Sequence, residues 1–170
     1  RVEASTWNTT AGISGEFIAR HSNNASLDDF TNPMDSGDSL GAVRFQGSAN
    51  SGFRNGANIE AVTTEVWDAT GWGTSLVFRT VADASTTLVE ALRINQDQVI
   101  GIQASTILSH DPNHEAVIQL GSQSSLWASS TGAVTLAENA YHNGTNWVHS
   151  TTDETARMSL QNGRFILQQV

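Results

Sequence analysis

The sequence predicts an all-β protein built of short hairpins and meanders. Apolar and polar residues alternate over short stretches, Gly-rich turns separate these stretches, and almost no stretch is long enough for a helix. The clearest unit is Arg157–Leu160, then Asn162-Gly163, then Arg164–Leu167. Asn-Gly supplies the positive φ angles of a two-residue hairpin turn, so we expect a hairpin here and another around Asn143-Gly144.

Composition limits the classes of function. The chain has 170 residues, enough for one domain or two small ones, and it begins at Arg1, so we expect a piece of a longer or processed protein. It has no Cys, which excludes disulfides and thiol nucleophiles. The net charge of -9 argues against a nucleic-acid partner. No apolar run approaches the ~20 residues of a membrane span, so no membrane insertion is expected.

We expect four segments in chain order. They are a polar N-terminal segment at 1–36, a β-rich domain at 37–102, a connector at 103–114 and a C-terminal hairpin module at 115–170. In the first segment, Ser26–Phe30 fits one capped helical turn. Thr87–Glu90 matches the capping box of a helix but also fits the alternation of a strand. Periodicity alone does not decide between helix and strand here.

Two motifs resemble bacteriophage tail fibre and tailspike proteins, over roughly residues 35–170. The first is Gly37-Asp38-Ser39-Leu40-Gly41 followed by an alternating strand to Gly47, with similar strands at Ser75–Thr80, Glu90–Ile94 and Val99–Ile102. The second is the hairpin from Asn139 to Trp147, which is similar to an Ala-Tyr-x-x-Gly-x-x-Trp unit of phage fibre modules. The first motif favours a strand at Thr87–Glu90.

The resemblance implies an elongated, intertwined homotrimeric β-prism or β-helix-like fibre with small knob-like parts. It implies a virion location in a tail fibre or spike, and attachment to a host cell-surface glycan or protein receptor alongside other tail proteins. Physically, a short hairpin is marginal alone, but three copies can bury their apolar faces against one another. The expected trimer core is Val43, Phe45, Leu76, Phe78, Leu92, Ile94, Leu160 and Phe165.

Aromatic residues are the candidates for receptor contact. A Trp or Tyr ring stacks on a sugar ring and adds one polar group. Trp72, between Gly71 and Gly73, is the expected exposed tip, and Trp67, Tyr141 and Trp147 are further candidates. Burial at the trimer interface fits Trp127 and Trp147 at least as well, because both lie in strand-like alternation.

Catalytic, cofactor and metal sites are not expected, although a bound metal ion stays open. His110 and His114 have a ligand-like spacing, but Pro112 between them argues against the helix that this spacing needs. Glu60, Glu65 and Asp68 cluster around one strand and its loop, and Asp28, Asp29, Asp35 and Asp38 form an acidic run; a solvated face explains both better. We expect Asp38 to form a turn with its own backbone.

Three functions follow from these patterns. We prefer a non-enzymatic, structural and adhesive fibre component. The alternatives are a trimeric glycan depolymerase, which needs a pair of carboxylates at a set distance, and a monomeric carbohydrate-binding β-module.

Overall fold

The structure is a computed structural model that describes residues 18–24, 31–104, 107–108, 110, 114–130 and 132–169, with backbone only at 115. Within these ranges the chain forms twelve strands and no helix, which confirms the all-β prediction. The predicted helical turn at Ser26–Phe30 lies outside the described residues. None of the described residues forms a helix long and apolar enough to cross a membrane.

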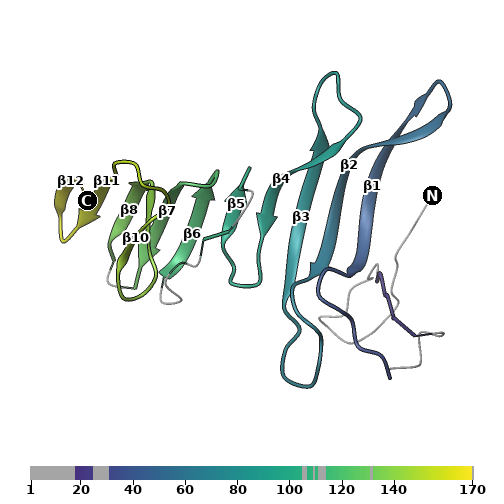
Figure 1. Ribbon diagram of the computed structural model, residues 1–170, viewed down its shortest axis with the longest axis horizontal. Coiled ribbons are helices and arrows are strands. Elements are labelled where there is room, and N and C mark those ends of the chain that lie inside the picture. Colours follow the sequence, from purple (N-terminus) through teal and green to yellow (C-terminus); the bar gives the residue numbers. More distant parts are fainter. Residues whose placement is uncertain are drawn as a thin grey trace, which may run out of the picture.

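Ten strands form one sheet, in the order β1-β2-β3-β4-β5-β6-β7-β8-β11-β12, and β9 and β10 form a separate pair. In Figure 1 the strands lie side by side along the long axis of the molecule, so the sheet spans its length. Their bounds are β1 Ser39–Ala49, β2 Gly52–Thr63, β3 Thr74–Val81, β4 Leu88–Ile94, β5 Ile100–Ile102, β6 His114–Leu120, β7 Ser124–Ser129, β8 Val134–Glu138, β9 Ala140–His142, β10 Trp147–His149, β11 Ala156–Gln161 and β12 Arg164–Gln169.

β5 and β6 are the one parallel pair among the described strands, with Ile100 opposite Ile118 and Ile102 opposite Leu120. A parallel pair needs a crossover connection between its strands. The connector between β5 and β6 is that crossover, and the sheet continues from one side of it to the other. The division of the chain into four segments stays a prediction.

The β11–β12 hairpin has the predicted two-residue turn. Asn162 and Gly163 have φ angles of 50° and 72°, and Leu160 lies opposite Phe165. The hairpin predicted around Asn143-Gly144 also forms, between β9 and β10, but its two-residue turn is wrong, because four residues separate His142 from its partner Trp147. Asn143 Oδ1 accepts hydrogen bonds from the N–H groups of Thr145 (3.0 Å) and Asn146 (2.9 Å), which holds the longer loop.

Most of the segment that also matched a capping box lies in strand β4, which begins at Leu88. β4 pairs with β3 along its length and with β5 at Leu92–Ile94. Pairing within the sheet outweighs the local helix signal, because tertiary context routinely overrides propensity.

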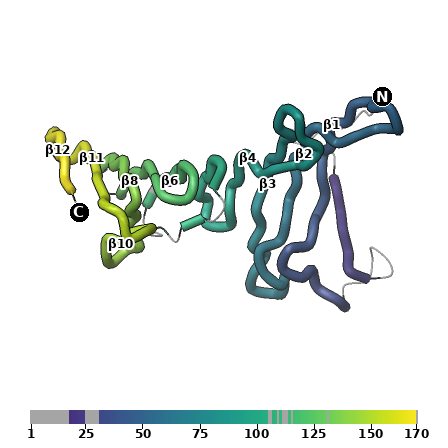
Figure 2. The backbone as a smooth tube through the Cα atoms, turned by 45° about the horizontal axis from the view of Figure 1, so that its top comes forward, coloured from purple at the N-terminus to yellow at the C-terminus, as the bar shows by residue number. Residues whose placement is uncertain are grey.

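One face of the large sheet carries the core of the chain, and we call it the core face. Its buried cluster is Val99, Val117, Trp127 and Ala137, with Ile107 and Trp147 packed against it. Ile107 belongs to the connector and Trp147 to the β9–β10 hairpin, which Figure 2 shows set off to one side of the sheet. The most deeply buried large side chain is polar Gln119, so this core is small for the sheet that it covers.

Candidate functional site

The opposite face of the sheet is apolar across nine consecutive strands, and we call it the apolar face. One row of directly opposed residues runs from β2 to β12 without a polar member. The row is Ala61, Leu76, Ile94, Ile100, Ile118, Leu126, Leu136, Met158 and Leu167. A second row is Val43, Ile59, Phe78, Leu92, Ile102 and Leu120.

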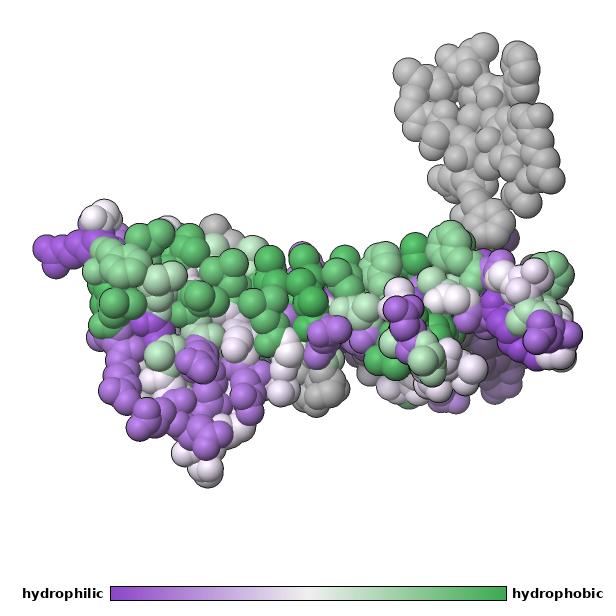
Figure 3. Space-filling model, turned by 90° about the horizontal axis from the view of Figure 1, so that it is seen from above, coloured by the Kyte–Doolittle hydropathy of each residue, from purple (hydrophilic) through white to green (hydrophobic). Residues whose placement is uncertain are grey.

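Many side chains of the apolar face are exposed. Leu167 and Phe165 at the β12 end are 71% and 60% exposed, and Phe45 on β1 is 54% exposed. Figure 3 looks along the strands and shows the apolar side chains as a continuous band on one side of the sheet. Exposed apolar patches of this extent mark an interaction surface. A large side chain gains about 1.5–3 kcal/mol when it becomes fully buried, so covering this face would stabilise the sheet considerably.

All the residues predicted for the trimer core lie on the apolar face. Val43, Leu76, Leu160 and Phe165 are exposed, whereas Phe78, Leu92 and Ile94 are partly buried. Sequence reasoning missed the central members Ile118, Leu126, Leu136 and Met158 as a set. Their alternation within each strand was the available signal, but only the register of the sheet aligns them.

Trp67 and Trp72, two of the predicted receptor contacts, line the same pocket of about 700 Å³. Trp72 is 70% exposed, and its indole N–H donates to the Asp68 carbonyl at 2.8 Å. Asp68 Oδ1 in turn accepts from Thr70 N and Oγ1, both at 2.6 Å. These bonds hold the exposed indole ring in one orientation.

Tyr141 and Trp147 have partners within the chain. Trp147 lies with one face under the Arg157 guanidinium, 4.2 Å from the ring centroid, and its centroid is 5.5 Å from that of buried Trp127. Tyr141 meets His110 edge-on at 5.5 Å. Trp127 lies on the core face and not on the apolar face, so its burial comes from the chain's own core.

His110, His114 and His142 form an aromatic cluster with these rings. His114 stacks on Trp127, with centroids 5.3 Å apart and planes inclined by 21°, and it lies 6.3 Å from both His110 and His142. Burial, and to a lesser extent the neighbouring His114, lower the pKa of His110 to about 4. Neither ring nitrogen of His110 has a hydrogen-bond partner among the described residues.

The three imidazoles do not build a metal site. Among the described residues, no group of three His, Cys, Asp or Glu side chains is placed to hold a metal ion. The rings of His110 and His114 are neighbours, but they pack within an aromatic cluster instead of around a metal ion.

The acidic residues make structural bonds. Glu60 bonds Arg79, and hydrogen bonds from Ser39 and Arg79 lower its pKa. Glu65 Oε1 accepts from Gly73 N at 2.5 Å. Asp38 was expected to bond its own backbone, but its Oδ2 accepts from the N–H of Asp35 at 2.8 Å, in a turn that the Asp38 N–H closes to the Asp35 carbonyl at 3.2 Å. Asp28 and Asp29 lie outside the described residues.

Comparison with known proteins finds the fold but no sequence family. No protein-family model and no curated protein matches the sequence. The carboxy-terminal domain of the bacteriophage T5 L-shaped tail fibre is similar in structure, with a TM-score of 0.58 and 10% identity over 99% of this chain and 81% of that one. The same domain with its intramolecular chaperone domain gives a TM-score of 0.56 and 12% identity, over 99% of this chain and 55% of that one.

The resemblance that the two sequence motifs indicated is therefore confirmed at the level of the fold. This chain has a fold similar to that of a bacteriophage tail fibre carboxy-terminal domain.

Proposed function

We propose that the chain is a structural and adhesive part of a bacteriophage tail fibre or tailspike, assembled as a homotrimer and located in the virion tail. The single observation that carries this proposal is the apolar face, whose long row of opposed apolar residues is half-buried or exposed in the described part of the chain. The similarity in fold to a phage tail fibre domain supports the same role.

Copies of the chain itself are the partners that best fit the apolar face. The face extends over nearly every strand of the sheet, so its partner must have the same length and an equally apolar surface. Another copy meets both conditions. The resemblance favours three copies around one axis, each contributing one sheet as a side of a prism.

The test is the mass of the purified chain in solution. One chain has a mass of 18.2 kDa, and light scattering coupled to gel filtration should give three times that value. A dimer or a stable monomer would contradict the trimer, and a monomer with a melting transition at high temperature would favour the carbohydrate-binding module.

Attachment to the host cell surface is the adhesive half of the proposal. The rigid, exposed Trp72 beside Trp67 supports a receptor contact at the loop between β2 and β3. Whole-cell binding by the fluorescently labelled fragment tests it, and cells that bind no more of the fragment than of a labelled control protein would contradict attachment.

We propose a role without catalysis, because Glu60, Glu65 and Asp68 are each engaged in structural bonds. Incubation with host surface polysaccharide should leave chain lengths unchanged. Shortened chains would identify a depolymerase instead.

A further inference from the structure

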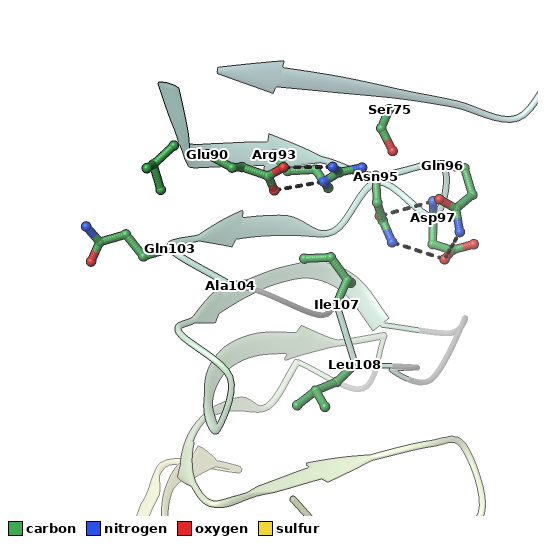
Figure 4. A pocket seen from close by; sticks show the side chains of 11 residues that line it. Ser75, Glu90, Arg93, Asn95, Gln96, Asp97, Gln103, Ala104, Ile107 and Leu108 are labelled. Carbon is green, nitrogen blue, oxygen red and sulfur yellow. Dashed lines mark hydrogen bonds and ion pairs between the residues drawn. The ribbon is translucent and has the colours of Figure 1, made fainter. Parts of the chain in front are cut away.

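The crossover between β5 and β6 creates a pocket on the core face, with a volume of about 870 Å³. Its lining combines side chains of β4, the turn after β4 and the connector, as Figure 4 shows. Because the pocket lies opposite the apolar face, burial of that face between copies does not close it. Ligand sites are typically concave pockets of several hundred Å³ in which a few polar groups converge.

The connector wall of the pocket is fixed in place. Ile107 packs onto Gly101, and a Cβ at Gly101 would lie only 2.4 Å from Ile107 Cδ1. Leu108 N donates to Gln119 Oε1 at 2.7 Å, and Gln103 N donates to the Ala91 carbonyl at 3.0 Å. The wall is therefore preformed, which lowers the entropic cost of binding a ligand.

The opposite wall is polar and equally ordered. Arg93 donates to Glu90 through Nε (2.8 Å) and Nη2 (2.7 Å), which uses two of the five N–H donors of its guanidinium. Asn95 Oδ1 accepts from Val99 N at 2.8 Å, and Gln96 Nε2 donates to Asp97 Oδ2 at 3.0 Å. Planar amide, carboxylate and guanidinium groups thus line one side of the pocket.

The charge of the lining disfavours an anionic ligand. Glu90 and Arg93 cancel, and Asp97 leaves one negative charge in a chain whose net charge is -9. A phosphate or an acidic sugar would be repelled, whereas hydroxyl groups can both donate to the carboxylates and accept from the amides.

Two further features point to an amphipathic, hydroxyl-rich ligand. Ile107 and Leu108 give the connector side an apolar surface opposite Arg93 and Asn95 (Figure 4), and such a surface suits the C–H face of a sugar ring. Ser75 at the back of the pocket is fully buried, and its hydroxyl has no partner among the described residues. A buried hydroxyl without a partner is costly, so the polar lining is incomplete in the free protein.

We propose that this crossover pocket binds a neutral, hydroxyl-rich ligand, namely a short run of uncharged sugar residues. The inference rests on the proposed function for the source of the sugar, a polysaccharide at the host surface. It assigns a site separate from the Trp67–Trp72 pocket, with a different lining.

A glycan array that carries neutral oligosaccharides beside uronic-acid and sialic-acid oligosaccharides tests the ligand class. Titration calorimetry with the best neutral tetrasaccharide then tests the site. The pocket variant is Glu90→Gln/Arg93→Gln, which removes the ion pair and leaves an uncharged polar amide at both positions. Its matched control is Glu60→Gln/Arg79→Gln, which removes a second ion pair of this face among the described residues, outside the pocket.

We expect neutral glycans to bind, with affinity reduced about 10-fold or more in the pocket variant and less than about twofold in the control. If the pocket variant does not fold, Gln96→Ala at an exposed position replaces it and should weaken binding about threefold. Binding of acidic glycans alone, no binding, or equal affinity in the pocket and control variants overturns the inference. If the protein is a trimer but binds no neutral glycan, the proposed sugar site is wrong and the proposed assembly is not affected. If it is a monomer that binds a neutral glycan through this pocket, the trimer is wrong and the sugar site is supported.

Discussion

Leu126 lies directly opposite Leu136 across the β7–β8 pair, on the apolar face. Both strands lie inside the large sheet, between β6 and β11. The two side chains are 36% and 40% exposed, although apolar residues flank them on both sides of the row. Residues of interior strands are normally well covered. Their exposure locates the surface where the proposed copies meet.

Leu136→Asp should prevent assembly, because each trimer would carry three buried carboxylates at one level, without partners for their charge. We expect light scattering to show a single-chain mass or aggregated material. Gln123→Asp, in the exposed turn between β6 and β7, adds the same charge as a control and should leave the mass unchanged. An assembled Leu136→Asp protein would place the interface elsewhere.

Trp72→Ala should weaken host-cell binding without a loss of stability, since an exposed ring held on a rigid loop contributes contact area and little core packing. We expect binding to fall about 10-fold and the free energy of unfolding to change by less than about 0.5 kcal/mol. Phe53→Ala is the matched control, because Phe53 is 71% exposed at the opposite end of β2. If both variants lose the same amount of host-cell binding, Trp72 is not a specific receptor contact.

Acid should destabilise the chain through His110. Its pKa of about 4 in the folded chain lies below the usual 6.5, so the unfolded chain binds the extra proton between these values. The stability contribution is therefore complete above pH 6.5 and is lost as the pH falls toward 4. Because solvent reaches part of the ring, we expect a loss of about 1–2 kcal/mol.

Urea unfolding followed by Trp fluorescence at pH 7 and pH 4.5 measures this loss. In His110→Gln the difference between the two pH values should shrink, whereas His149→Gln, at an exposed position, should behave like the wild type. An unchanged pH difference in His110→Gln would assign the acid sensitivity to other groups.

Gly101→Ala should displace the connector from the core face. The added methyl group would lie 2.4 Å from Ile107 Cδ1 and 3.3 Å from Ala104 Cβ. Overpacking of this kind costs about 1–3 kcal/mol, and the melting temperature should fall accordingly. Gly47→Ala is the control, since nothing lies within 4 Å of the corresponding position. Equal melting temperatures would mean that the Ile107 side chain moves aside freely.

Asn139→Ala should release the segment after the β9–β10 hairpin. Asn139 Oδ1 accepts from Thr151 N at 2.8 Å, and Nδ2 donates to the Asp153 carbonyl at 2.9 Å, while its φ angle is 53°. Losing these bonds and straining the backbone should cost about 2–4 kcal/mol. Hydrogen exchange at residues 150–154 should accelerate.

Asn139→Gly separates the two causes. Glycine loses the same side-chain bonds but adopts the positive φ angle without strain, so it should be about 1 kcal/mol more stable than the alanine variant. If the two variants are equally stable, the backbone conformation contributes nothing measurable.

The faces of single strands were predictable from the sequence, and the order of the strands was not. Leu76 and Phe78, or Leu92 and Ile94, share a face because side chains alternate along any strand. The parallel pairing of β5 with β6 depends on a crossover whose path no local pattern encodes. The rings of His110, Trp127 and Tyr141 come from segments far apart in the sequence, so no local pattern could predict that they cluster.

Local hydrogen bonding limited the predictions of loops. The β11–β12 turn follows the Asn-Gly rule, whereas Asn143 bonds the two residues after Gly144 and lengthens its loop. Trp67 and Trp72 line one pocket because the loop between β2 and β3 carries both. Tyr141 and Trp147 were grouped with them as aromatics, but partners distant in sequence surround both rings.

The strands lie across the long axis of the molecule (Figure 1), so a pull along that axis acts on the bonds between neighbouring strands rather than on covalent backbone. β5 pairs with β4 and with β6 through only three residue pairs each. Under tension these two short pairings bear the same force as the longer ones, with fewer bonds to share it. The stretched sheet should therefore yield first on one side or the other of β5.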